Sequence, residues 1–212
     1  EGAHQKILRA CRRIAKENIA IPVLLGRTAE IQRKAKELEV PLDGVTIMEP
    51  ETAPRRQEYV SEFYRLRQRR GVTLGAAGEL MKDRNIFGAM MVRMGDADAL
   101  VAGVSQNYPD TIRPALQVIG VREGIHKVSG VYLIVARNGD LYFLADATVN
   151  IEPTAEDLAE IALCAAQEAR HFNVEPRVGM LSFSTFGSTR HPLCEKMRRA
   201  AELVRYADPK LI

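Results

Sequence analysis

Apolar residues along the first fifty positions follow two patterns, a helical spacing and short continuous runs. They recur every three or four positions from Ile7 to Ala15, which predicts a helix. The apolar run 21–25 then predicts a short buried strand, and a second helix and strand follow over 28–38 and 45–48. Helices and strands that alternate at this spacing favour a parallel sheet with right-handed crossovers.

Helical spacing dominates the next fifty residues and then gives way to one more apolar run. Three helices are predicted, over residues 53–70, 74–82 and 85–94. The apolar run 99–104 predicts another strand. A polar loop follows it and leads to a short helix predicted over 115–119. This half of the chain therefore continues the alternation of strand and helix.

The second half of the chain contains two strong local signals. The apolar runs 128–136 and 141–145 flank Asn138–Gly139, and Asn-Gly favours a tight hairpin turn because both residues tolerate positive φ. We therefore predict an antiparallel strand pair. Thr154 is a typical helix N-cap, and Asp157 stands in the capping-box position that Glu or Gln usually takes.

Residues 141–190 have the pattern of a strand–helix–strand unit. Two apolar strands are predicted on either side of a helix over 155–172, and each strand runs into a loop of small polar residues. Open α/β sheets bind ligands at the carboxyl ends of their strands. Asp146 and the loop 182–190, which contains Ser184, are therefore candidate cleft residues.

An irregular stretch separates the two halves. Residues 120–127 are charged and interrupted by glycine, so we predict two domains, 1–123 and 124–212. The elements together predict an α/β protein with a partly mixed sheet. Because the chain opens directly on a helix and stops at apolar residues that resemble the start of a strand, we expect both domains to be incomplete.

Composition narrows the classes of function. Hydrophobic residues make up 46% of the chain and charged residues 27%, which is ordinary for a soluble globular protein. The net charge is only +3 and both signs are interspersed, so we expect no nucleic-acid partner. Cys11, Cys164 and Cys194 lack the spacing of a zinc or redox motif and are predicted to be free thiols. Without an apolar run of membrane-spanning length, we expect a cytoplasmic protein with no membrane partner.

Polar residues crowd the exit of the strand predicted over 99–104. Free backbone N–H groups at the start of a helix attract anions, and Arg113 adds a full positive charge there. Arg113 is therefore a candidate anion-binding residue. The alternative is that Asp110 or Thr111 caps the helix while Arg113 pairs with a surface carboxylate.

A cluster of four arginines lies near the end of the helix predicted over 53–70. Cations near a helix C-terminus are favoured by the helix dipole, so a solvated basic turn explains the cluster. The second interpretation is that one or two of these residues bind a phosphate, since guanidinium groups pair with phosphate through two hydrogen bonds. The four residues are Arg65, Arg67, Arg69 and Arg70.

Three stretches of the sequence are long and specific. They read DTIRPALQ, ADATVNIEPTAEDLAEIA and EPRVGMLSFSTFGS. Together they resemble the phosphate acetyl/butyryltransferase family along essentially the whole chain. The resemblance implies a two-domain, three-layer α/β/α fold similar to isocitrate and isopropylmalate dehydrogenases, with a cleft between the domains and a homo-oligomer built on the second domain.

The resemblance also implies roles for particular residues. It places the family's substrate-binding arginines at Arg113 and Arg67. Free-standing phosphotransacetylases typically have a histidine and a hydroxyl pair before the DTIRP motif, where this chain has Gln106, Asn107 and Tyr108. Those hydroxyls help to hold the phosphoryl substrate, and we count Asn107 and Tyr108 as candidate binding residues. The family's catalytic Ser-Arg pair and Asp lie beyond the stretch that this chain matches. We therefore assign no catalytic residue and no metal ligand here.

The strings NYPDTIRPALQVIG and STFGSTRHP are similar to the phosphotransacetylase-like C-terminal domain of hybrid NADP-dependent malic enzymes. This branch implies a regulatory domain that binds acetyl-CoA. NADP and a divalent metal would bind only in the malic enzyme part, which converts malate to pyruvate and lies outside this segment. The alternative is an active phosphate acetyltransferase that moves acetyl between CoA and phosphate. A third hypothesis is a structural dimerisation module.

Overall fold

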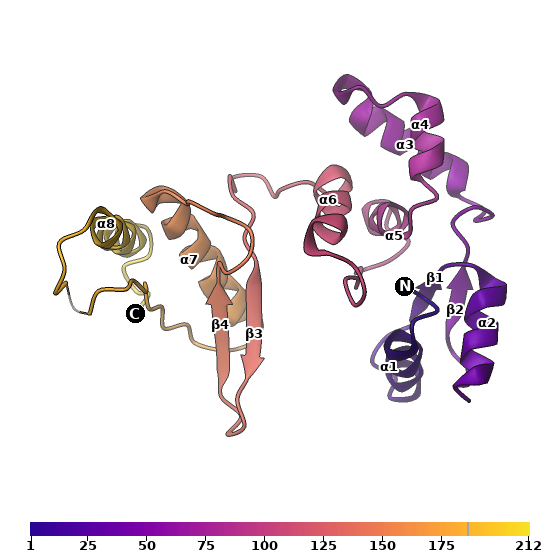
Figure 1. Cartoon of the computed structure of the whole chain (residues 1–212), viewed down its shortest axis with the longest axis horizontal. Helices are drawn as coiled ribbons and strands as arrows, with labels where there is room; N and C mark the ends of the chain where they lie inside the picture. Colours follow the sequence, from indigo (N-terminus) through magenta and orange to yellow (C-terminus); the bar gives the residue numbers. More distant parts are fainter. Residues whose placement is uncertain (186) are drawn as a thin grey trace. The chain divides into compact units, whose positions relative to one another are not determined.

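The first 120 residues build a unit of helices around two short parallel strands (Figure 1). The computed structural model describes residues 1–185 and 187–212. The elements of the first unit are α1 (Gln5–Lys16), β1 (Val23–Leu25), α2 (Thr28–Glu37), β2 (Thr46–Met48), α3 (Arg56–Arg67), η1 (Gln68–Arg70), α4 (Leu74–Leu80), α5 (Arg84–Arg93) and α6 (Tyr108–Val118). Residues 121–212 form the second unit, with β3 (Val131–Val135), β4 (Leu141–Ala145), α7 (Ala155–His171) and α8 (Pro192–Ala207).

Strands β1 and β2 are parallel, with Leu24 opposite Ile47, and this pairing confirms the parallel arrangement predicted from the sequence. Two strands of three residues are marginal by themselves. Leu8 of α1 and Ile31 of α2 supply the missing burial, since both are fully buried in one core with Leu24. Burial of each such side chain stabilises the unit by about 1.5–3 kcal/mol.

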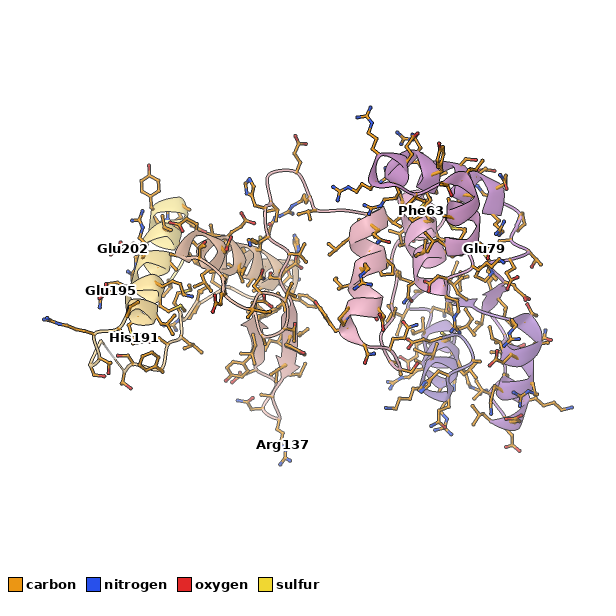
Figure 2. All side chains as sticks on the ribbon, turned by 45° about the horizontal axis from the view of Figure 1, so that its top comes forward. Phe63, Glu79, Arg137, His191, Glu195 and Glu202 are labelled. Atoms are coloured by element: carbon orange, nitrogen blue, oxygen red, sulfur yellow. The ribbon has the colours of Figure 1, made fainter. Side chains whose placement is uncertain are left out.

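A second core fills the space between α3, α4, α5 and α6. Phe63 of α3 and Phe87 of α5 are completely buried there, and Val118 connects α6 to the same core. Figure 2 shows Phe63 among the packed side chains of this unit. At the edge of the core, the buried Tyr59 donates its hydroxyl proton to Asp96, which ties α3 to the turn after α5. Helix α6 is therefore held on a rigid group of helices.

The second unit begins with the antiparallel pair β3 and β4, in which Leu133 lies opposite Phe143. This pair confirms the predicted hairpin. Gly139 has a φ of 91°, a conformation that glycine adopts without strain. Asn138 donates its side-chain amide to the Asp140 carboxylate at 2.6 Å, which closes the turn. Figure 2 shows Arg137 at the tip of this hairpin.

Helix α7 begins with the capping box that the sequence predicts. The Asp157 N–H donates to the Thr154 hydroxyl at 3.1 Å, and the Thr154 N–H donates back to the Asp157 carboxylate at 3.0 Å. Small residues on one face of α7, including Ala162 and Ala166, pack in one core with Val204 of α8. Alanines at this spacing let the two helices approach closely.

Two predicted strands are wrong, since neither the run 99–104 nor the apolar run that begins at Val178, after the predicted helix 155–172, forms a strand. A strand needs a neighbouring backbone to pair with. The N–H groups of Gly103 and Val104 instead donate to the Glu1 side chain. In the other stretch Val178 donates to the carbonyl of Ile212 at 2.7 Å, and no ladder follows among the residues described.

Helix α6 begins at Tyr108, seven residues before the predicted start. Pro114 lies inside it, although proline removes one backbone hydrogen bond and usually ends a helix. The prediction that Arg113 stands at the start of a helix is therefore wrong. Arg113 lies in the middle of α6, one residue before this proline.

Both units contain helices, and each has one strand pair, which is parallel in the first unit and antiparallel in the second. The structure is therefore mixed α/β. The three-layer, dehydrogenase-like architecture stays a prediction. Within the residues described, no helix combines the length and hydrophobicity that a membrane span requires.

Candidate functional site

The candidate site is built on the loop 103–107, which leads directly into α6. The Glu1 carboxylate accepts the N–H groups of Gly103 and Val104, both at 3.0 Å. It also accepts the N–H and the hydroxyl of Ser105, each at 2.7 Å. Burial raises the pKa of this carboxyl, but the hydrogen bonds outweigh burial and lower the pKa to about 2. The carboxylate therefore fixes the start of the loop.

A buried asparagine fixes the end of the loop. Asn85 at the start of α5 is only 5% exposed. Its side-chain nitrogen donates to the Gln106 side-chain oxygen at 2.6 Å and to the Asp110 backbone carbonyl at 3.3 Å. Since Pro114 has no N–H to give this carbonyl four residues before it, Asn85 supplies the donor that the proline lacks.

Three of the predicted site residues lie together on this segment. Asn107 is the N-cap of α6 and makes no side-chain capping bond, while Tyr108 opens the helix and is 42% exposed. Arg113 is exposed further along α6. Within the described part of the chain it makes no ion pair or side-chain hydrogen bond. The alternative in which Arg113 pairs with a surface carboxylate therefore has no support in the structure.

Arg67, at the end of α3, differs from its arginine neighbours. Arg65 donates twice to the Glu62 carboxylate, at 2.7 and 2.8 Å. Arg67 is partly buried, and its Nε is a fully buried donor without a partner among the residues described. A buried donor without an acceptor is uncommon and costs roughly 1–3 kcal/mol. The helix-dipole explanation therefore accounts for the basic turn but does not explain the buried Nε.

The two remaining predicted residues belong to the second unit. Asp146 accepts the backbone N–H groups of Gly130, Thr148, Val149 and Asn150 at 2.8–3.2 Å, together with the Asn150 side-chain amide at 2.5 Å. Burial opposes ionisation of this carboxyl, but these hydrogen bonds lower its pKa. Asp146 thus organises the loop after β4, and its oxygens are already engaged.

Ser184 lies in the loop before α8 and is bound to neighbours within that loop. Its hydroxyl oxygen accepts the Thr189 N–H at 3.1 Å and lies 3.4 Å from the Ser188 hydroxyl. No charged side chain of the described residues bonds to it. Ser184 and Asp146 therefore maintain local loop structure in the second unit.

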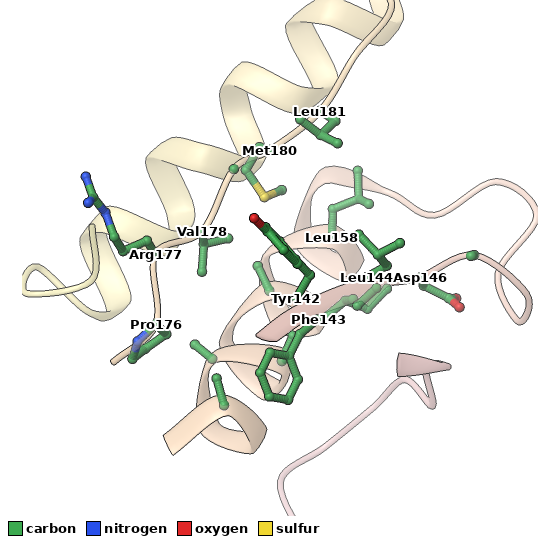
Figure 3. Close-up of a pocket in the computed structure, with 18 of the residues that line it drawn as sticks. Tyr142, Phe143, Leu144, Asp146, Leu158, Pro176, Arg177, Val178, Met180 and Leu181 are labelled. Atoms are coloured by element: carbon green, nitrogen blue, oxygen red, sulfur yellow. The ribbon is translucent and has the colours of Figure 1, made fainter. Parts of the chain in front are cut away.

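A cavity of about 800 Å³ also lies in the second unit, between β4, α7 and residues 174–183 (Figure 3). Its lining is mostly apolar, including Phe143, Leu158 and Met180. Lys196 at its margin donates to the Pro153 carbonyl at 2.9 Å. The cavity contains none of the candidate arginines, and we assign the ligand-binding chemistry to the α6 segment instead. In the described residues no three His, Cys, Asp or Glu side chains gather to hold a metal ion.

Sequence reasoning missed Glu1 and Asn85, and it assigned no binding role to Gln106. Asn85 gave no distinct signal, because it is the last of four consecutive polar residues, 82–85, that precede the apolar stretch Ile86–Met91. Glu1 gave no signal either, because its partner Ser105 is 104 positions away.

Comparisons with known proteins place this geometry in context. The phosphate acetyltransferase of Bacillus subtilis (strain 168) is 42% identical over 211 residues, covering 100% of this chain and 65% of the relative. The NADP-dependent malic enzyme of Escherichia coli (strain K12) is 38% identical over 216 residues, covering 100% of this chain and 28% of the relative. This chain therefore spans less than two thirds of either relative.

A comparison with a solved structure agrees with these sequence comparisons. The phosphotransacetylase from Streptococcus pyogenes matches with a TM-score of 0.90 and 37% identity, over 100% of this chain and 64% of that one. The family model described as phosphate acetyl/butaryl transferase matches residues 1–212. The chain therefore belongs to the phosphate acetyl/butaryl transferase family.

Proposed function

We propose that this chain is part of an enzyme that transfers an acetyl group between CoA and phosphate. The observation that carries the proposal is the exposed Arg113, without an ion pair in the described structure, on a helix whose preceding loop is fixed at both ends. A guanidinium without a protein partner can bind a phosphoryl group through two hydrogen bonds without first giving up an existing ion pair. The phosphate acetyltransferases among its relatives support this reaction.

The chemistry of acetyl transfer determines which role such a guanidinium would have. The sulfur of CoA forms a bond to the acetyl carbon, the bond between that carbon and the phosphate oxygen breaks, and the thiol proton ends on the released phosphate. Inorganic phosphate then leaves with the bonding electron pair. Negative charge grows on the phosphate oxygens during this step, and a fixed cation stabilises it. Arg113 supplies that cation, and Arg67 has a buried Nε that would gain an acceptor from a bound phosphate.

The experiment measures acetyl-CoA formation from acetyl phosphate and CoA by the complete protein. Arg113→Ala is expected to lower kcat/KM about 100-fold, and Arg113→Lys is expected to retain part of the activity, because lysine keeps the charge but loses the two-pronged geometry. The matched control is Arg137→Ala, which removes an exposed arginine from the hairpin tip and should change kcat/KM less than twofold. Unchanged activity in Arg113→Ala would overturn the proposal.

A second candidate function is an acetyl-CoA-binding regulatory domain of an NADP-dependent malic enzyme. It is favoured by Asn107 and Tyr108, which stand at the start of α6 in place of the hydroxyl pair that the family resemblance leads us to expect, and by the relative from E. coli. NADP and the divalent metal would then be bound outside this chain. Calorimetry that detects acetyl-CoA binding without turnover of acetyl phosphate, together with malate oxidation that responds to acetyl-CoA, would favour this function over the first.

A further inference from the structure

The carbonyl of Asp110 determines how two side-chain amides near the candidate site are oriented. A carbonyl oxygen can only accept a hydrogen bond, so the Asn85 group 3.3 Å from it must be the NH2 group. The same nitrogen is 2.6 Å from the Gln106 side chain, which must therefore present its oxygen. Both protons of the Asn85 amide are thus used, one on each acceptor.

Pro114 makes this arrangement obligatory. An ordinary residue at this position would donate its own N–H to the Asp110 carbonyl and leave Asn85 free to rotate. Proline has no N–H, so the carbonyl needs an outside donor, and the 5% exposed Asn85 provides it. Burial makes the wrong orientation costly, because a rotated Asn85 would place its oxygen against the carbonyl oxygen.

The orientation of the Asn85 amide also determines the orientation of the Gln106 amide. Because its oxygen faces Asn85, its NH2 group must point away from Asn85. Gln106 is only partly buried, and this NH2 group has no acceptor among the residues that the structure describes. The protein thus holds an uncharged two-proton donor in a fixed orientation, on the same segment as Arg113.

We infer that Gln106 is a ligand-binding residue whose amide NH2 donates to a phosphate oxygen of the substrate, and that Asn85 is the positioning residue that orients it. The inference rests on the proposed function, since it takes a phosphoryl compound as the ligand. Asn85 acts only through Gln106. A neutral donor of this kind binds phosphate or acetyl phosphate without adding to the charge that Arg113 supplies.

The test measures the Kd of inorganic phosphate by calorimetry on the complete protein. Gln106→Met keeps the length of the side chain but removes the donor, and we expect Kd to rise about tenfold. Gln106→Glu keeps the acceptor for Asn85 and adds a negative charge, so Kd should rise further. The control is Gln117→Glu, the same change on α6, the helix that follows this loop, and it should leave Kd within twofold of the wild type.

A double mutant tests the positioning role. In Asn85→Asp the new carboxylate can only accept, so Gln106 turns its NH2 group inward and presents its oxygen to the ligand. Kd should then rise about as much as in Gln106→Met, and the double variant should be no weaker than either single variant, because both remove the same bond. Additive losses would overturn the positioning role.

The outcomes separate the two proposals. If wild-type protein binds phosphate and Gln106→Met binds it equally well, the inference about Gln106 is wrong while the proposed function stands. If wild-type protein binds neither phosphate nor acetyl phosphate, both are wrong. Gln106→Met alters a partly exposed loop residue, so it tests the inference even if Asn85→Asp fails to fold.

Discussion

Glu1 and Ser105 are joined by two hydrogen bonds of 2.7 Å, although they lie 104 positions apart in the sequence. One bond comes from the Ser105 N–H and the other from its hydroxyl. The stretch that precedes Ser105 was predicted to be a strand, and its N–H groups donate to this carboxylate instead of to a neighbouring strand. A single side chain therefore fixes the start of the loop that leads to Arg113.

This relationship predicts a stability that depends on pH. The folded-state pKa of Glu1 is about 2, below the ordinary value of 4.5, so its contribution is fully present above pH 4.5 and is lost as the pH falls toward 2. Glu1→Gln should lower the free energy of unfolding at pH 7 by about 1 kcal/mol, because the carboxylate is partly exposed. The loss should shrink as the pH is lowered from 5 to 3. Urea denaturation at each pH measures this.

The control for that experiment is Glu51→Gln, an exposed residue without a hydrogen bond in the described structure. Other carboxylates also titrate in this range, so the comparison between variant and wild type isolates Glu1. An equal loss of stability at pH 7 and pH 3 would contradict the assigned role.

Asp146→Asn should destabilise the second unit. The carboxylate accepts four backbone N–H groups, and asparagine would replace one of its oxygens with a donor that points at other donors. We expect a loss of about 1–3 kcal/mol in the free energy of unfolding, with faster hydrogen exchange at Thr148–Asn150. The control is the exposed Glu152→Gln. If Asp146 instead bound ligand and left the loop unaffected, stability would stay the same and ligand affinity would change.

Local signals allowed most of the second unit to be predicted from the sequence. Gly139 sets the hairpin because the turn needs positive φ at this position. Thr154 and Asp157 start α7, and the two partners lie only three residues apart. In such cases the residues that determine the structure are neighbours in the sequence. The parallel pair β1 and β2 was also predictable, since each strand is short, apolar and followed by a turn or helix.

The candidate site was less predictable because distant residues build it. The rule that proline disfavours a helix interior placed the start of α6 too late, since Asn85 supplies the missing donor from 25 positions away. The predicted strand over 99–104 failed because Glu1 takes its N–H groups. The sequence identified Arg113 as a candidate, but it could not predict the contacts that hold the segment around this residue.

Glu160 is predicted to hold the segment that opens the second unit. Its carboxylate accepts the N–H groups of His126 and Lys127, both at 2.8 Å, and lies 3.1 Å from the His126 ring nitrogen. Burial raises the pKa of this carboxyl, but the bonds to Lys127 and His126 lower it. Glu160→Gln should therefore speed hydrogen exchange at these two amides at least tenfold at pH 7.

A matched change on the same helix is Glu156→Gln, which alters an exposed residue at the start of α7. It should leave the exchange at His126 and Lys127 within twofold of the wild type. Protection that survives in Glu160→Gln would mean that other contacts hold the segment.

Arg67→Met is expected to raise stability while it weakens ligand binding. In the wild type the buried Nε without a partner destabilises the fold by roughly 1–3 kcal/mol, and the substitution removes this penalty. It also loses about 0.3–1 kcal/mol of favourable interaction between the cation and the helix C-terminus. The free energy of unfolding should therefore rise by about 1 kcal/mol. Since a phosphate would lose one guanidinium partner, kcat/KM for acetyl phosphate should fall about tenfold. Arg70→Met, an exposed neighbour in η1, should change either quantity little. A variant at Arg67 that is both less stable and fully active would show that this side chain serves the fold and not the ligand.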